Sequence, residues 1–166
     1  MAKMIDEKPS FKGEGKVWNK LSEYLPSDMV VYNQREINGR EYDFCVMAEN
    51  LGIVVIEVKG WLAERIIVNG VDNIDVEGYE KPQTSPKKQA RAYRFAILNK
   101  ISEKYNVSPL VLDMVCYPFI SKAEYESSRL DIVSEEQYTI FKEDLEDCER
   151  LNNKIINVAF FIIHHL

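Results

Sequence analysis

The chain has 166 residues, of which 46% are hydrophobic and 29% are charged, a composition typical of one soluble globular domain. Its formal net charge of −6 excludes a protein that binds nucleic acid through overall charge alone. Residues 1–12 hold no apolar run like that of a secretion signal, and the apolar run 155–166 is too short to cross a bilayer. We therefore expect a single domain with no membrane segment.

The three cysteines, Cys45, Cys116 and Cys148, are far apart, and no close Cys or His pair has zinc-site spacing. Two of them lie within apolar runs, which favours buried free thiols and a reducing, cytoplasmic location. His164 and His165 are the remaining candidates for a small site, although their terminal position in an apolar run argues against one.

The predicted elements follow from the spacing of apolar residues and from the turn residues between them. Helical periodicity predicts helices at 12–25, 86–105, 122–127 and 143–153. Runs of β-forming residues predict strands at 29–37, 42–48, 53–58, 63–68, 74–76, 110–117 and 138–141, the last at a sheet edge. Asn38-Gly39 predicts a hairpin turn, and Ser85-Pro86 predicts an N-cap followed by the first helical residue. The run 155–166 fits a final buried strand or helix.

This order of elements predicts an α/β fold, a three-layer α/β sandwich with a central mixed β-sheet. Hairpins would join the first strands, and the helix at 86–105 would cross over to a later strand. The strand at 53–58 is apolar on both faces and should be central.

The most informative residues are charges in positions where the pattern predicts burial. Glu57 and Lys59 share a strand face with Ile53 and Val55, because side chains alternate along a strand. An unpaired buried charge costs several kcal/mol, so this Glu-x-Lys pair should have polar partners.

Asp43, in the preceding strand, is the first candidate partner. Opposed residues of a hairpin share a face, so Asp43 reaches the Glu-x-Lys pair only if the connecting loop has an odd number of residues or contains a bulge. A three-residue loop such as Asn50-Leu51-Gly52 would satisfy this condition, and Gly52 suits the positive φ that such a loop needs. A two-residue turn would send Asp43 to the opposite face.

Glu14 and Gln89 also lie on the apolar sides of their predicted helices. Glu14, Asp43 and Glu57 together offer the oxygen ligands that Mg²⁺ or Mn²⁺ prefers. Lys59 would orient a nucleophile or neutralise charge on a phosphate, and Gln89 would position Lys59 or a water. Each of these residues taken alone also has an ordinary structural interpretation, such as a strand-end ion pair or an acidic residue in a first helical turn.

In this combination the residues resemble the nuclease-related domain (NERD) family, a branch of the PD-(D/E)XK nuclease superfamily with a restriction-endonuclease-like fold. The matching stretches are Gly13-Glu14, Glu41-Tyr42-Asp43, Ile56-Glu57-Val58-Lys59-Gly60-Trp61 and Pro86-Lys87-Lys88-Gln89. They cover residues 13–118, which we expect to be the core of a single domain of residues 1–166. Tyr42 stands where the superfamily name would place proline.

The resemblance implies a Mg²⁺-dependent nuclease in which Asp43 and Glu57 bind metal, Lys59 is catalytic, and Glu14 and Gln89 assist. Family members often form the N-terminal part of larger proteins, including fusions to helicases and kinases. The chain ends in His164-His165-Leu166 with no polar tail, which fits the N-terminal part of a longer protein with such a partner domain.

The nucleic-acid substrate, for which DNA is favoured and RNA is the alternative, would be held by a basic helix face and one aromatic ring. The predicted nucleic-acid-binding residues are Lys87, Lys88, Arg91, Arg94 and Trp61. A solvated helix surface and a tryptophan packed against the sheet rim are the alternatives for these positions. The alternative for the whole domain is a non-catalytic module that keeps the nuclease fold to bind nucleic acid or protein, which the acidic net charge would suit.

Overall fold

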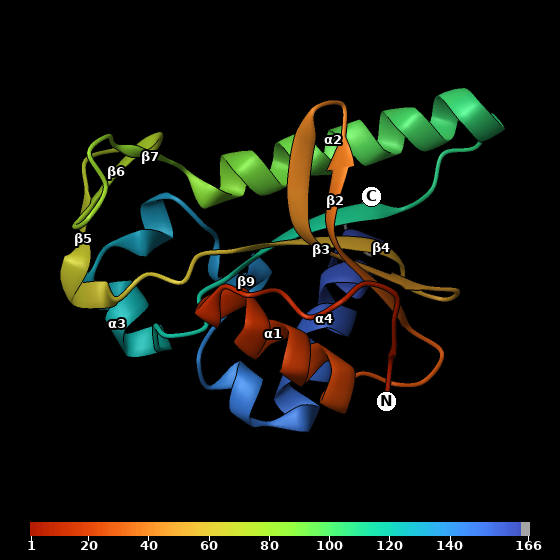
Figure 1. The fold of residues 1–166 in the computed structure, drawn as a ribbon, viewed down its shortest axis with the longest axis horizontal. Coiled ribbons are helices and arrows are strands. Elements are labelled where there is room, and N and C mark those ends of the chain that lie inside the picture. Colours follow the sequence, from red (N-terminus) through yellow and green to blue (C-terminus); the bar gives the residue numbers. More distant parts are fainter. Residues whose placement is uncertain (164–166) are drawn as a thin grey trace.

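The two predicted hairpins form the centre of a six-stranded mixed sheet in the computed structural model (Figure 1). The structure describes residues 1–163, and their side chains through residue 158. The sheet runs in the order β1 (Lys3–Met4), β2 (Val30–Ile37), β3 (Arg40–Ala48), β4 (Gly52–Val58), β8 (Val111–Cys116) and β9 (Thr139–Ile140). A second, three-stranded sheet contains β5 (Ile66–Val68), β6 (Asn73–Val76) and β7 (Gln83–Thr84). The helices are α1 (Lys12–Tyr24), α2 (Pro86–Tyr105), α3 (Lys122–Ser127) and α4 (Cys148–Ile163).

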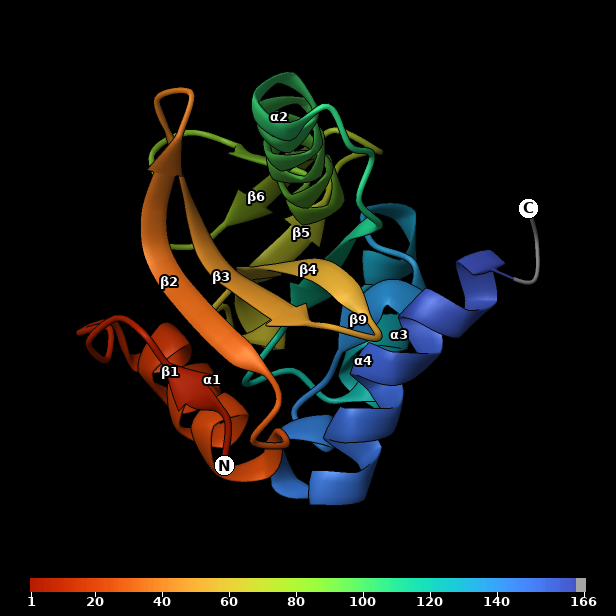
Figure 2. The ribbon, with the colours of Figure 1, turned by 90° about the vertical axis from the view of Figure 1, so that its right-hand side faces the viewer.

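Helices cover both faces of the main sheet because its central strand is apolar on both sides. On one face, α1 and α4 pack their apolar residues against β3, β4 and β8 in the largest core cluster. On the other face, Ile97 of α2 packs against Val55 of β4 and Cys45 of β3. Figure 2 shows α2 on one side of the sheet and α1 and α4 on the other. The predicted three-layer α/β sandwich with a central mixed sheet is therefore confirmed.

The turns set the register of the central strands. Asn38 and Gly39 have φ angles of 51° and 75°, as a two-residue hairpin turn between β2 and β3 requires. The β3–β4 pairing closes at Ala48↔Gly52, so the loop has three residues, the odd number that brings Asp43 to the Glu57 face. Its residues are 49–51 rather than 50–52, and Gly52 opens β4 with φ +90°. After β4 the chain crosses over through α2 and returns as β8, parallel to β4.

The second sheet packs with α3 over a separate, aromatic-rich core. This cluster contains Trp61, Ile74, Tyr117, Tyr125 and Phe141. It places β5–β7 beyond the end of β4, at the same end as the beginning of α1 (Figure 1).

Some boundaries differ from the predicted ones for local reasons. The last helix begins at Cys148 rather than at residue 143, because Asp147 Oδ1 accepts a hydrogen bond from Arg150 N at 3.0 Å and thereby caps the helix. Residues 63–65 form a 3₁₀ turn rather than the start of a strand. The two-residue strands β1 and β7 were not predicted, since such short segments carry no periodic signal.

Ser85 occupies the predicted N-cap position of α2, but its side chain does not cap the helix. Its Oγ donates instead to the carbonyl oxygen of Val133 at 3.0 Å. Cys45 and Cys116 are buried free thiols, as predicted, whereas Cys148 is exposed. His164 and His165 lie outside the described residues. Within the described chain, every helix is too short or too polar to span a membrane.

Candidate active site

A cleft of about 610 Å³ opens at the end of β4, between the first turn of α1 and the second sheet. Its floor comes from the ends of β3 and β4 and the residues that follow β4. The predicted site residues that line it are Glu14, Asp43, Glu57, Lys59 and Trp61. The fold thus brings together side chains from α1, β3, β4 and the segment that follows β4.

Asp43 and Glu57 face each other across the β3–β4 pair. The last residues paired in this ladder are Phe44 and Ile56, and one further step places Asp43 opposite Glu57. Asp43 Oδ2 accepts a hydrogen bond from the backbone N–H of Val58 at 2.7 Å. The Asp43 carboxylate therefore occupies the point at which the backbone ladder between the two strands stops.

Lys59 compensates the charge of Glu57. Glu57 is only 4% exposed, and its Oε1 lies 2.7 Å from Lys59 Nζ. A carboxylate this deeply buried is costly unless a cation or hydrogen-bond donors surround it. The Glu-x-Lys spacing supplies that cation from the same strand face.

Negative charge is concentrated around Asp43. Burial, followed by the neighbouring charge of Glu57, raises the pKa of Asp43 to about 8. Burial together with the charges of Glu57 and Asp43 raises the pKa of Tyr93, on α2, to about 12. In both groups burial is the larger cause of the raised pKa, and the neighbouring carboxylates add to it.

Glu14 is held by Gln34, a residue that sequence reasoning missed. Gln34 Nε2 donates to Glu14 Oε2 at 3.0 Å. Gln34 has φ 51° in the middle of β2, a left-handed conformation that sends its side chain out of the strand's regular alternation. Burial raises the pKa of Glu14, and the hydrogen bond from Gln34 opposes that shift. No sequence pattern signals this contact, because it depends on one irregular backbone angle.

Two glycines bring α1 close to the end of β4. A Cβ atom on Gly13 would lie 3.1 Å from Gly60 Cα, tighter than ordinary packing allows. The absence of a side chain at Gly13 therefore lets the first turn of α1 lie directly against the residue that follows Lys59. This contact puts Glu14 at the cleft.

Of the five predicted catalytic residues, Gln89 is the one that does not line the cleft. It lies half-buried in the first turns of α2, and its Oε1 is a buried acceptor with no hydrogen-bond partner among the described residues. Such an orphaned oxygen is costly unless a bound water or ligand satisfies it.

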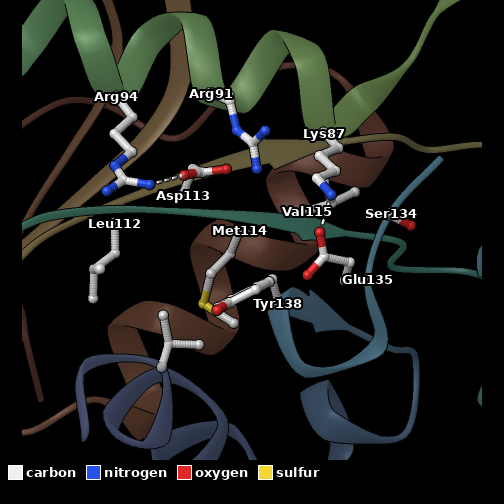
Figure 3. Close-up of a pocket in the computed structure, with 11 residues that line it drawn as sticks. Lys87, Arg91, Arg94, Leu112, Asp113, Met114, Val115, Ser134, Glu135 and Tyr138 are labelled. Carbon is white, nitrogen blue, oxygen red and sulfur yellow. Dashed lines mark hydrogen bonds and ion pairs between the residues drawn. The ribbon is translucent and has the colours of Figure 1, made fainter. Parts of the chain in front are cut away.

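The basic residues of α2 lie elsewhere, at a smaller pocket of about 80 Å³ between α2 and β8 (Figure 3). Lys87 is ion-paired with Glu135, and Arg94 Nη1 lies 3.2 Å from Asp113 Oδ1. Burial and the nearby Arg91 lower the pKa of Lys87.

On the exposed side of the same helix, Lys88 Nζ lies 3.2 Å from Asp72. Of the four predicted basic residues on α2, Arg91 is therefore the one without a carboxylate partner among the described side chains.

Trp61 is 5% exposed and belongs to the second core, where its ring centroid lies 6.4 Å from that of Tyr117. Lys59 Nζ lies 5.8 Å from the centroid of the indole ring. The buried indole therefore offers a nucleic-acid base in the cleft little free ring surface.

The residues present fit a hard divalent cation as a site of two carboxylates. In the described part of the chain, no group of three or more His, Cys, Asp or Glu side chains is arranged to hold a metal ion. Magnesium, however, commonly binds through one or two carboxylates, keeping waters and substrate phosphates as its other ligands. Asp43 and Glu57, crowded and buried, provide such a donor set, with Glu14 on the neighbouring wall.

An α/β domain with two carboxylates and a lysine at the ends of adjacent central strands has the arrangement of a PD-(D/E)XK nuclease core. Residues 9–118 match the model of the nuclease-related domain, and the chain belongs to that family. No curated protein matches the chain. A repair endonuclease from Pyrococcus abyssi is similar over 81% of this chain, at 13% identity and a TM-score of 0.40. The chain spans 48% of that endonuclease, and a likeness this distant says nothing about activity.

Proposed function

We propose that this domain hydrolyses phosphodiester bonds of DNA with the help of Mg²⁺ or Mn²⁺. The observation that carries the proposal is the pair Asp43 and Glu57, opposed on the floor of a cleft with Lys59 Nζ 2.7 Å from Glu57 Oε1. Membership of the nuclease-related domain family supports the reaction class.

Each residue has a role that its position supports. When bound, Mg²⁺ or Mn²⁺ supplies Lewis-acid stabilisation of the phosphodiester and a more acidic attacking water. Asp43 and Glu57 would hold the cation. Lys59 would donate a hydrogen bond to a phosphate oxygen and stabilise the charge that develops there.

Glu14, Gln34 and Gln89 would position the reacting groups and would not themselves contact the bond that is cleaved. Glu14, held by Gln34, lies on the α1 wall of the cleft and adds an oxygen for the cation or for one of its waters. Gln89, with its unsatisfied Oε1, positions Lys59 or a water. A fused helicase or kinase domain stays a prediction from the family resemblance.

The test is cleavage of single- and double-stranded DNA and of RNA by the purified chain with Mg²⁺, Mn²⁺ or EDTA. Asp43→Asn and Glu57→Gln keep the shape of each side chain and remove its charge. Glu103→Gln, on the exposed side of α2, is the matched control. We expect metal-dependent cleavage of DNA that both site variants abolish and the control retains. Cleavage that persists in both site variants, or that needs no divalent cation, would refute the proposal.

A non-catalytic binding module is the second candidate. The net charge of −6 favours it. Calorimetric titration with Mg²⁺ and Mn²⁺ separates the two, because a pure binding module has no need of metal at Asp43 and Glu57. Metal binding that Asp43→Asn removes supports the nuclease, and absence of both binding and cleavage supports the module.

A further inference from the structure

Two aromatic rings on the walls of the cleft are exposed to solvent. Phe11, immediately before α1, is 69% exposed, and Tyr79, in the second sheet's wall, is 55% exposed. Neither ring contributes to a core cluster. Large exposed rings beside a charged cleft are typical of surfaces that stack on a ligand.

The same two walls carry exposed cations, one of which, Lys12, lies with its Nζ 5.6 Å from the centroid of the Phe119 ring. Lys12 lies on the α1 wall and Arg65 on the opposite wall, and both are exposed. Among the described side chains, neither has a carboxylate partner, in contrast to Lys87 and Arg94 on α2. Glu77 lies on the same wall as Arg65, so the positive charge of that wall is partly balanced by a carboxylate.

We infer that the cleft binds a single-stranded nucleic acid, with bases stacked on Phe11 and Tyr79 and phosphates between Lys12 and Arg65. A ring can stack on a base only if the face of that base is uncovered, and in a duplex the neighbouring base pairs cover it.

This inference rests on the proposed function for one point, the placement of the scissile phosphate over Asp43 and Glu57. The floor between the two walls is where these carboxylates lie. A strand that crosses from Lys12 to Arg65 passes over them. An unpaired strand or a frayed end is therefore the substrate class that reaches the buried Glu57.

The test measures binding without cleavage, by fluorescence anisotropy of labelled oligo(dT), oligo(U) and a blunt duplex with the full chain in EDTA. The two single strands separate DNA from RNA preference. We expect the preferred single strand to bind about tenfold more tightly than the duplex. Phe11→Ala and Tyr79→Ala should each weaken that binding about fivefold or more, as loss of one base–ring stack does.

Matched controls are Phe95→Ala and Tyr105→Ala, which remove exposed rings of α2 that do not line the cleft. Both control variants should bind the single strand as tightly as the wild type. Tyr79→Phe, which keeps the ring, should also retain the wild-type affinity. Because both cleft rings are exposed, the thermal midpoints of their variants should match that of the wild type, so weaker binding is not a folding effect.

Equal or tighter binding of the duplex, or indifference to both ring substitutions, would overturn the inference. Cleavage of DNA with ring-independent binding would overturn it while leaving the nuclease proposal in place. Ring-dependent binding of a single strand with no cleavage under any metal condition would support it and refute the hydrolysis proposal alone.

Discussion

Lys59 and Glu57 form a largely buried ion pair, whose formation costs desolvation of both groups. Both groups lie at the floor of the cleft, and Asp43 adds a second carboxylate beside them. In the metal-free protein, Lys59 is the cation that makes the burial of Glu57 tolerable. A divalent cation at the same carboxylates would replace Lys59 in that role and free its ammonium group for substrate.

Lys59→Met tests this exchange. The substitution keeps the aliphatic volume and leaves Glu57 buried without its cation, so we expect the free energy of unfolding in EDTA to fall by about 3 kcal/mol. Mg²⁺ should raise the thermal midpoint of the variant more than that of the wild type, because the metal then relieves an unpaired charge. Cleavage should be lost.

Thermal unfolding with and without Mg²⁺ provides the measurement, and Lys100→Met, at an exposed position of α2, is the control. A variant as stable as the wild type in EDTA would show that Lys59 does not balance Glu57.

Much of this site follows from the sequence by register alone. Alternation along β4 places Glu57 and Lys59 together, and an odd-numbered loop brings Asp43 to the same face. Gln34 could not be found this way, since its contact with Glu14 needs a left-handed residue inside a strand. Packing of Trp61 against the sheet rim was one of the two interpretations from the sequence, but the core that covers it could not be predicted, because that core is assembled from segments far apart in the chain.

At the scale of elements, the length of the β3–β4 loop decides on which face of the sheet Asp43 lies. Gly52, the residue that follows this loop, is held in place by close contacts. A Cβ atom at Gly52 would lie 2.6 Å from the carbonyl oxygen of Leu110, and its φ is +90°. Gly39, in the β2–β3 turn, also has positive φ, but nothing lies within 4 Å of a Cβ built there. The two positions therefore differ in steric contact more than in backbone conformation.

We expect Gly52→Ala to lower the free energy of unfolding by about 3 kcal/mol, the sum of a left-handed backbone and an overpacked contact. Gly39→Ala should cost only about 1 kcal/mol, the backbone part alone. Urea denaturation of both variants provides the comparison. Equal losses at the two glycines would mean that the strand pair relaxes away from Leu110 without cost.

Helix α2 was predicted to hold nucleic acid, and in the structure three of its four predicted basic residues, Lys87, Lys88 and Arg94, are paired with carboxylates. The ion pair between Arg94 and Asp113 ties α2 to β8 at a half-buried position. The exposed Arg91 lies one turn earlier and has no ion pair with a described side chain. No sequence pattern separates these two arginines, since the partner of Arg94 comes from a strand that follows the helix.

Arg94→Ala should therefore act on stability. We expect a loss of about 1–2 kcal/mol in the free energy of unfolding, reduced from the cost of a fully buried pair because Arg94 is partly exposed. Arg91→Ala should be neutral. Affinity for oligo(dT) should change in neither variant. If Arg94→Ala left the stability unchanged and weakened binding of oligo(dT), α2 would be part of the nucleic-acid interface after all.

At the scale of the whole molecule, the fold was predictable because hydrophobic patterning fixes the long elements and their layers. The strands of residues 30–58 and the helices at 12–24 and 86–105 carry strong periodic signals and match their predicted positions closely. The second sheet and its packing against α3 were less accessible, since two- and three-residue strands are held by tertiary contacts rather than by their own sequence. The cleft lies between these two parts, so its exposed rings became visible only in the structure.

The net charge of −6 also limits how the molecule meets a polyanion. If Lys12 and Arg65 supply the phosphate contacts, the logarithm of the binding constant for oligo(dT) should fall with the logarithm of salt concentration with a slope of about −1.4, about −0.7 for each neutralised phosphate. Lys12→Ala and Arg65→Ala should each make the slope shallower by about 0.7, and Lys100→Ala should leave it unchanged. Anisotropy titrations across a range of salt concentrations measure all four slopes. A slope of about −3 or steeper in the wild type would require more cations than the cleft provides, and the uncompensated Arg91 would be the first to substitute next.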